Sequence, residues 1–356
     1  MVLLPALLLA RQASGEPSLA RDLWAANVQH NIERINHSGE LGVHIKDMAS
    51  GAIVSVRSDE FWYLASGVKV PVAVALLQQV EKDIVSLDSK IRLTETDYVD
   101  GAGRTNRYRP GSQLSVRFLL EQMLIYSDNT ASDMLIRLVG LDAVNAVLAE
   151  QVPRGFGTVT TLADVRRSIY SGFHPQATGL RGRDFLRIRA QPDNRRISEL
   201  AKVIAVPMEQ FALANIDSAY EAYYATHMNT GSLAAYSAFL EAIVRGQLLQ
   251  PETTAYLLDL LANVKTGTRR IKAGLPASVT FAHKTGTQHR RICDLGIATG
   301  PASNANQDNI LLIAACSRDF SSLADAEAAL RKVGEILATS GVWSTEPTAK
   351  ESIKTH

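Results

Sequence analysis

The stretch that decides the fold reads Ser66-Gly67-Val68-Lys69, and it leads into an apolar run that continues to Val80. The run has no glycine and keeps apolar residues at helical spacing, which predicts a buried helix over 68–80. Because residues three apart share a helix face, Lys69 is expected one turn from Ser66. A serine becomes a nucleophile when a neighbouring base takes its proton, and a buried lysine can be that base. Alone, however, Ser66 reads more simply as an ordinary helix N-cap.

Two further motifs follow in order along the chain. Ser127-Asp128-Asn129 joins helices expected over 114–125 and 130–139, where Asp128 suits a helix cap and its two neighbours suit a catalytic role. Lys284-Thr285-Gly286-Thr287 follows a β-rich run. On an edge strand, a backbone N–H can point at an oxyanion and a threonine hydroxyl at a carboxylate, while glycine permits close approach.

The sequence K-T-G-T occurs twice, and only one copy fits that strand. Lys265-Thr266-Gly267-Thr268 follows a helical stretch and precedes a basic run, so we expect a helix–strand loop there. The strand motif is therefore assigned to Lys284 and its neighbours.

The rest of the chain predicts an α+β fold. Two early strands and three late ones are expected to form one antiparallel five-stranded sheet, flanked by terminal helices and set beside a mainly helical domain. The sheet domain comprises 17–65 with 275–340, the helical domain 66–274, and a tail follows at 341–356. Helices are expected over 17–36, 141–152, 197–206, 233–244, 251–264 and 323–340, and strands over 41–47, 52–57, 279–283, 292–299 and 310–316.

Residues 153–228 give a weaker pattern, because glycine and proline break their first part. Part of this segment is strongly basic. We expect a solvated helix face there, with an anion site as the alternative. The arginines concerned are Arg181, Arg183, Arg187, Arg189, Arg195 and Arg196.

Composition excludes several classes of protein. The 356 residues are 46% hydrophobic and 21% charged, with a formal net charge of +1, so no field of one sign favours nucleic acid or an anionic membrane. Neither the eight histidines nor the two cysteines stand at metal-ligand spacing, and no glycine-rich phosphate loop is present. We expect no metal, no cofactor, no membrane span and a monomer.

Residues 1–15 begin with the apolar run MVLLPALLLA, which is shorter than the roughly 20 residues that span a bilayer. With small residues after it, the segment favours a secretory signal and a periplasmic or secreted protein. The run has no basic residue before it, so a plain disordered terminus is the alternative.

With its three motifs in this order, the chain resembles the class A β-lactamase family of serine hydrolases, within the wider group that includes penicillin-binding proteins. The likeness extends beyond the motifs to the first hairpin, to the loop at 267–276 and to the strand and turn at 292–301. It covers roughly residues 20–150 and 228–340. It implies the β-lactamase/transpeptidase fold.

The resemblance also implies roles for individual residues. Ser66 attacks the lactam carbonyl, Lys69 takes or relays its proton, and Ser127 passes a proton to the leaving nitrogen. The backbone N–H groups of Ser66 and Thr287 form the oxyanion hole. Among the other residues, Asn129 binds the side-chain amide of the substrate, Lys284 and Thr285 hold its carboxylate, and Tyr98 resembles the aromatic gate at the pocket rim.

Two departures from the family pattern matter. The family's E-x-x-L-N loop supplies the glutamate that hydrolyses the acyl-enzyme. No such motif occurs here: Arg166 and Arg167 follow Val159–Leu162 where an acid is expected, and the interval from Ser127 to Lys284 is roughly fifty residues longer than usual. Residues 153–228 are therefore an expanded loop or an insertion. A displaced acid could come from Glu199, Asp217 or Glu221, although each reads more simply as a surface charge.

The second departure is Cys293, which stands where an arginine often helps to hold the substrate carboxylate. Arg290 or Arg291 could substitute, or the anchor could come from elsewhere.

The positions of the two cysteines permit a disulfide. A hairpin centred between residues 304 and 305 would place Cys293 opposite Cys316, and opposite residues of paired strands point to one face. A cross-strand disulfide is then possible in an oxidising compartment. Two small buried apolar residues are an equal alternative.

Three functions remain open. A β-lactamase fits the close pattern around 229–301. A D,D-carboxypeptidase or transpeptidase acting on peptidoglycan fits the missing glutamate, with an acyl-D-Ala-D-Ala-like peptide as substrate. A non-enzymatic binder of β-lactams or muropeptides is the third, and the complete set of motif residues speaks against it.

Overall fold

The computed structural model describes residues 19–301 and 309–343, with the side chains of residues 19–22 left out. The expected signal at 1–15, the turn within 302–308 and the tail from 344 lie outside the described residues. Among the described residues, the central element is a five-stranded antiparallel sheet in the order β2-β1-β9-β8-β7. Its strands are β1 (Glu40–Asp47), β2 (Ile53–Val56), β7 (Thr280–Gln288), β8 (Arg291–Gly300) and β9 (Asn309–Arg318).

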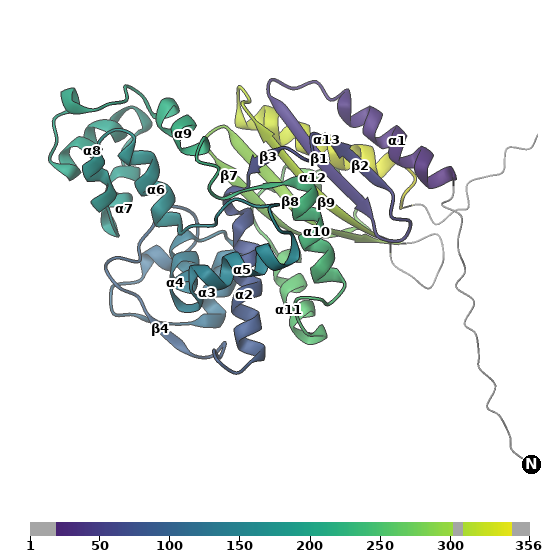
Figure 1. The fold of residues 1–356 in the computed structure, drawn as a ribbon, viewed down its shortest axis with the longest axis horizontal. Coiled ribbons are helices and arrows are strands. Elements are labelled where there is room, and N and C mark those ends of the chain that lie inside the picture. Colours follow the sequence, from purple (N-terminus) through teal and green to yellow (C-terminus); the bar gives the residue numbers. More distant parts are fainter. Residues whose placement is uncertain (1–18, 302–308, 344–356) are drawn as a thin grey trace, which may run out of the picture.

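Both faces of this sheet are buried, because successive side chains along each strand point alternately into two apolar layers. In β9, Leu311 and Ile313 belong to the layer beneath the terminal helices, and Leu312 and Ala314 to the larger core of the helical domain. The terminal helices α1 (Leu19–Glu33) and α13 (Leu323–Thr339) cover the first face, with the short α12 (Ile271–Gly274) beside α13 (Figure 1). The predicted α+β fold is confirmed.

The helical part is built around α2 (Lys69–Glu81), whose residues from Lys69 to Leu77 are all buried. A helix that is apolar on every side needs partners all round, and its neighbours provide them (Figure 1). These are α3 (Val116–Ile125), α4 (Asn129–Val139), α5 (Leu141–Gln151), α10 (Leu233–Val244) and α11 (Pro251–Ala262). Two small antiparallel pairs complete this part: β3 (Phe61–Tyr63) with β6 (Thr230–Ser232), and β4 (Lys90–Arg92) with β5 (Gln113–Ser115).

Most of the segment over 153–228 folds into a lobe of its own, at the upper left of Figure 1. We call it the 153–228 lobe. It contains α6 (Leu162–Ser171), α7 (Arg183–Arg189), α8 (Arg196–Ile204) and α9 (Ile216–Tyr224). Of these helices, sequence periodicity indicated only α8, although α6 and α9 are at least as long.

Of the two alternatives for the cysteines, the structure shows the disulfide. Cys293 on β8 stands opposite Cys316 on β9, and the two form a disulfide. Both side chains are about 1% exposed, so the bond lies inside the core between the sheet and the helices.

Candidate active site

Ser66 lies in a 3₁₀ turn, Ala65–Val68, that runs directly into α2. The N-cap residue of α2 is Val68 and makes no side-chain cap, so Ser66 is not serving as that cap. Its neighbour Ala65 has φ of +48°, a backbone conformation that costs energy in a non-glycine residue and is common at functional sites. The Tyr236 hydroxyl donates to the Gly67 carbonyl at 2.9 Å and holds the turn from α10.

The three motifs meet at the Ser127 hydroxyl. Lys69 Nζ lies 3.3 Å from Ser127 Oγ, and Lys284 Nζ lies 3.0 Å from the same atom. Lys69 also donates to the Ser127 carbonyl at 2.6 Å and to Asn129 Oδ1 at 2.8 Å. Ser127 itself has φ of +61°, so a second strained residue stands at this point. A hydroxyl between two lysine nitrogens is placed to relay a proton.

Burial shifts the pKa of both lysines. It lowers the pKa of Lys69 to about 7, although the carboxylates of Asp128 and Asp133 act in the opposite direction. Burial, together with the positive charges of Lys69 and Arg270, holds the pKa of Lys284 well below its ordinary value. Near neutral pH, a large fraction of Lys69 is therefore an uncharged amine that can accept a proton.

Asn129 and Asp128 begin α4. Asp128 is the N-cap and accepts from the Ala131 N–H at 3.0 Å, as predicted. The Asn129 side chain is fixed from both ends, since its Oδ1 accepts from Lys69 and its Nδ2 donates to the Asp100 carbonyl at 2.6 Å. One turn further along α4, Asp133 accepts from the N–H groups of Leu162 and Ala163, and burial raises its pKa to about 7.

The second K-T-G-T motif lies inside β7, whereas sequence periodicity placed the strand only before it. This strand runs directly against the turn that carries Ser66: a Cβ added to Gly286 would stand 2.3 Å from the Leu64 carbonyl oxygen. Only glycine permits this approach. Thr287, the next residue of β7, therefore lies close to the turn that carries Ser66.

The first K-T-G-T motif lies in the loop after α11, as expected, and this loop contacts the second motif. Thr266 and Thr285 share a hydrogen bond of 2.5 Å between their hydroxyls. The two copies are thus neighbours in space as well as alike in sequence.

Arg270 is a site residue that sequence analysis missed. Its guanidinium donates to Thr287 Oγ1 at 2.7 Å and to the carbonyls of Gly286 and Cys293 at 2.9 and 3.0 Å. The Glu327 carboxylate forms an ion pair with Arg270, with Oε1 3.4 Å from Nε. The only sequence signal was its place in the basic run after the first K-T-G-T copy. It supplies a positive charge next to Cys293, where the family pattern led us to expect one.

Arg290 and Arg291, the expected substitutes, are directed elsewhere. Arg290 donates to the Asp319 carbonyl, and Arg291 pairs with Asp319 at 2.7 Å and Glu221 at 3.2 Å. None of these contacts involves a residue of the three motifs.

Tyr98 needs a correction. It was expected at an open pocket rim, but its side chain is only 1% exposed and its hydroxyl donates to the Tyr108 carbonyl at 2.8 Å. The ring helps to line a separate hollow, together with Arg183, whose guanidinium lies 5.2 Å from its centre. Tyr98 is buried because the later part of the loop over 97–109 folds back over its ring.

The three candidate acids of the 153–228 lobe all stand beside basic side chains. Glu199 pairs with Arg187 and Lys202, Glu221 pairs with Arg291, and an oxygen of Asp217 lies 2.7 Å from His289 Nε2. None of these partners is a motif residue. Asp100, near Asn129, pairs with Arg166 at 2.6 Å.

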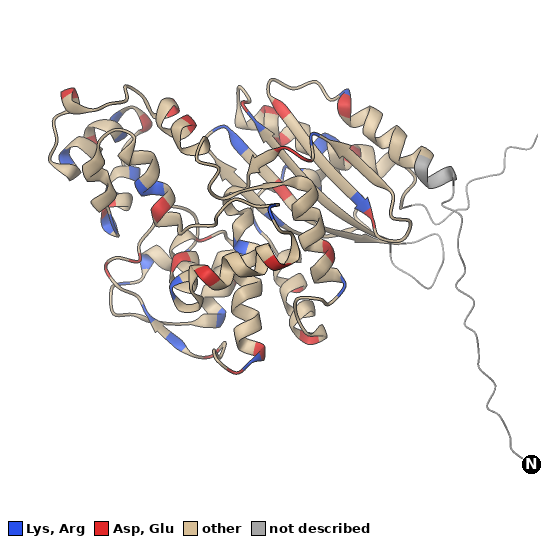
Figure 2. Ribbon diagram, viewed as in Figure 1, with Lys and Arg blue, Asp and Glu red and all other residues tan. Residues whose placement is uncertain are grey.

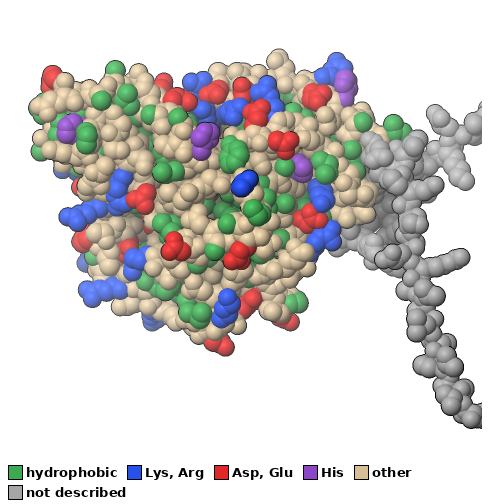
Figure 3. Space-filling model, in the orientation of Figure 1, with side chains coloured by type: hydrophobic (Ala, Val, Ile, Leu, Met, Phe, Trp, Pro, Cys, Tyr) green, Lys and Arg blue, Asp and Glu red, His purple; other side chains and the backbone are tan. Residues whose placement is uncertain are grey.

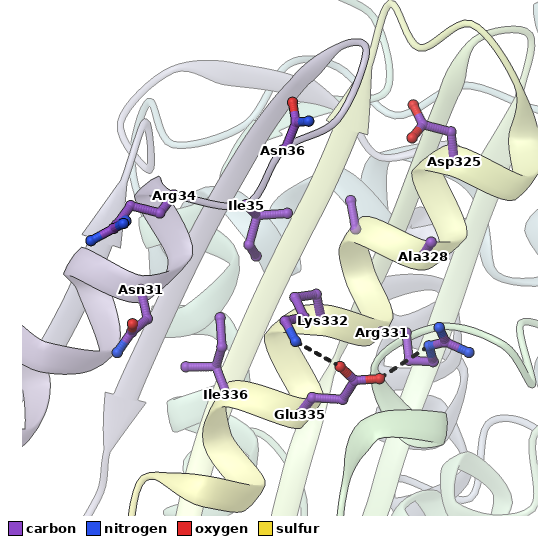
Figure 4. Close-up of a pocket in the computed structure, with 11 residues that line it drawn as sticks. Asn31, Arg34, Ile35, Asn36, Asp325, Ala328, Arg331, Lys332, Glu335 and Ile336 are labelled. Carbon is purple, nitrogen blue, oxygen red and sulfur yellow. Dashed lines mark hydrogen bonds and ion pairs between the residues drawn. The ribbon is translucent and has the colours of Figure 1, made fainter.

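A second hollow, of about 510 Å³, lies on the other side of the sheet between α1 and α13 (Figure 4). Among its charged residues, Glu335 pairs with both Arg331 and Lys332. No motif residue lines it.

Two general findings concern the described residues. No group of three or more potential metal-ligating side chains gathers there, and no described helix is long and apolar enough to cross a membrane. Acidic and basic side chains are interspersed over the face shown in Figure 3.

Lys69, Lys284 and Ser127 thus converge beneath the edge of an antiparallel sheet, next to the turn that carries Ser66. Comparison with known proteins gives the family. The model of the β-lactamase enzyme family matches residues 27–340, and the chain belongs to that family.

The individual relatives are distant. "Beta-lactamase L2" of Stenotrophomonas maltophilia is 26% identical over 70% of this chain and 64% of that protein, so the match spans less than two thirds of the relative. A β-lactamase of Mycobacterium tuberculosis is 23% identical over 82% of this chain and 80% of its own length.

Solved structures share the fold. The structure of PBP-A superposes with a TM-score of 0.64 at 19% identity, covering 89% of this chain and 94% of that one. A β-lactamase from Xanthomonas campestris also gives 0.64, at 22% identity, covering 89% and 97%.

Proposed function

We propose that β-lactams acylate this protein at Ser66 and that the acyl-enzyme is then hydrolysed. The observation that supports this best is the pair of buried lysines on either side of the Ser127 hydroxyl. Lys69 takes the Ser66 proton as Oγ bonds to the lactam carbonyl carbon. The C–N bond breaks, and the proton reaches the leaving nitrogen through Ser127, which leaves an ester on Ser66. Water then attacks that ester, releasing the acid and restoring the serine.

The remaining motif residues bind the substrate in this proposal. The N–H groups of Ser66 and Thr287 receive the oxyanion. Lys284, Thr285 and Arg270 hold the carboxylate of the lactam nucleus, and a bound carboxylate favours the charged form of Lys284. Asn129 binds the amide of the acyl side chain. Tyr98 has no part in it.

A second candidate is a D,D-peptidase that acts on peptidoglycan and releases β-lactams slowly. What favours it is the setting of the carboxylates near Ser66. Asp128 caps α4, Asp133 accepts two backbone N–H groups, and Asp100 is paired with Arg166, so each is already engaged. A solved structure of a PBP-A variant, which shares this fold, is an acyl-enzyme complex with penicillin G.

We further propose a periplasmic or secreted location. The disulfide between Cys293 and Cys316 supports it, because such bonds persist mainly in oxidising compartments.

The test is a time-resolved mass spectrum of the protein mixed with benzylpenicillin. We expect an adduct on Ser66 that disappears as product accumulates, and no adduct on Ser66→Ala; the exposed Ser321→Ala is the matched control. An adduct that lasts many minutes would instead favour the peptidase. If the wild type gives neither adduct nor product, the hydrolase proposal fails.

A further inference from the structure

A small hollow of about 210 Å³ opens between the 153–228 lobe and the end of β7. Three of its lining residues are arginines: Arg166 from α6, Arg189 from the end of α7 and Arg196 from the start of α8. Two tyrosines, Tyr170 and Tyr220, line it as well. We call this group the arginine cup. Figure 2 shows the basic positions along these helices of the lobe.

The cup carries excess positive charge. Arg166 is neutralised by Asp100 at 2.6 Å, and Arg196 pairs with Asp193, whose side chain is 88% exposed. Arg189 forms no ion pair within the part of the chain that the structure describes. Arg189 is exposed, so its guanidinium is accessible to one negative charge that enters the hollow.

The tyrosines add neutral donors to that charge. Burial raises the pKa of both Tyr170 and Tyr220, so their hydroxyls stay protonated at physiological pH. Tyr220 is held in place by the ring of His289, which stacks on it with centroids 4.7 Å apart. Guanidinium and phenol donors around one small space are typical of a carboxylate site.

The cup adjoins the proposed active site at two points. Asp100, on its wall, accepts through its carbonyl from Asn129 Nδ2. Gln288, also on its wall, follows Thr287 in β7. Because Asn129 binds the acyl side-chain amide in our proposal, that side chain leads toward the cup, while Lys284 and Arg270 lie on the carboxylate side of the nucleus.

We infer that the arginine cup binds a carboxylate on the acyl side chain of the substrate, so that the preferred acyl donors carry a second negative charge there. This inference rests on the proposed function and names its substrate class. The hollow of about 210 Å³ has room for a carboxylate and the few atoms that carry it. The same group could belong to a penicillin or to a peptidoglycan stem peptide.

The experiment compares benzylpenicillin with its α-carboxy analogue, which differs by one carboxylate. Second-order rate constants for acylation of Ser66 are measured by rapid-quench mass spectrometry. We expect the wild type to prefer the carboxylated compound. Arg189→Gln should lower that preference about tenfold, since a hydrogen bond to a charged group contributes about 1.5 kcal/mol or more. Arg189→Glu should reverse it.

Arg195→Gln is the matched control, because Arg195 is exposed like Arg189 but does not line the cup. A pair of acyl-D-Ala-D-Ala peptides, with and without a carboxylate on the acyl group, identifies the source of the ligand. If benzylpenicillin acylates Ser66 but no pair shows a preference that depends on Arg189, the inference alone is overturned. If nothing acylates Ser66, both it and the proposed function fail.

Discussion

At the scale of single residues, the most informative group is Lys69, whose pKa burial lowers to about 7. Because the uncharged amine is the base, we expect the acylation rate constant to rise as pH increases through about 7 and then to level off. Asp133 favours the charged form of Lys69. Asp133→Asn should therefore move the midpoint of this profile to lower pH.

The measurement is the second-order acylation rate constant from pH 5 to 9. Asp142→Asn is the control, since Asp142 is an exposed carboxylate on α5. A profile that does not respond to Asp133→Asn would show that Lys69 is not the titrating base.

Arg270 can be tested against its own neighbour. Arg269 and Arg270 both pair with Glu327, but the Arg269 side chain is 73% exposed, whereas Arg270 is 3% exposed and reaches Thr287. Arg270→Gln should reduce acylation by a penicillin about tenfold or more, because a buried charged donor is lost. Arg269→Gln should leave the rate constant unchanged. Equal effects of the two variants would mean that Glu327, and not substrate binding, explains the loss.

At the scale of elements, the contact between β7 and the turn that carries Ser66 decides whether the site is assembled. A Cβ on Gly286 would stand 2.3 Å from the Leu64 carbonyl, so Gly286→Ala must push strand and turn apart. A displacement of about 1 Å at a reacting centre costs about 100-fold in rate. We expect a loss of that order in acylation, with a fold that circular dichroism still shows to be intact.

Gly179→Ala is the control for this change, since a Cβ there meets no atom within 4 Å. Wild-type acylation by Gly286→Ala would show that the close approach is not required.

At the scale of the whole molecule, Arg291 links the 153–228 lobe to the sheet. Its guanidinium pairs with Glu221 on α9 and with Asp319 after β9, and lies 4.5 Å from the centre of the Tyr224 ring. Arg291→Met keeps much of the length but loses the charge. We expect about 1 kcal/mol of lost stability, a small figure because both carboxylates are about half exposed.

The change should appear as a lower melting temperature and as faster proteolysis within 205–229. Arg187→Met is the comparison, because Arg187 pairs with Glu199 inside the lobe and does not reach the sheet. If both variants are cleaved at the same rate, Arg291 does not hold the lobe to the sheet.

Much of the fold follows from local patterns that the chain carries in itself. Short β-rich runs predicted the strands of the sheet, and the apolar run after Ser66 predicted the buried α2. Register alone placed Cys293 opposite Cys316, because hairpin partners have a constant sum of residue numbers. Among the described helices of the 153–228 lobe, only α8 was predicted, because glycine and proline break the pattern in the first part of that segment.

The amino-acid sequence by itself determined the three motifs, their order and the sheet that supports them. Only the tertiary structure decided that Lys69 and Lys284, which are far apart in the chain, meet at one hydroxyl, and that Arg270 rather than Arg290 or Arg291 faces Thr287. It also decided that Tyr98 is buried and that arginines of the lobe surround a hollow beside the site. The physical reason is that periodicity and capping act over a few residues, whereas packing brings together side chains from distant segments.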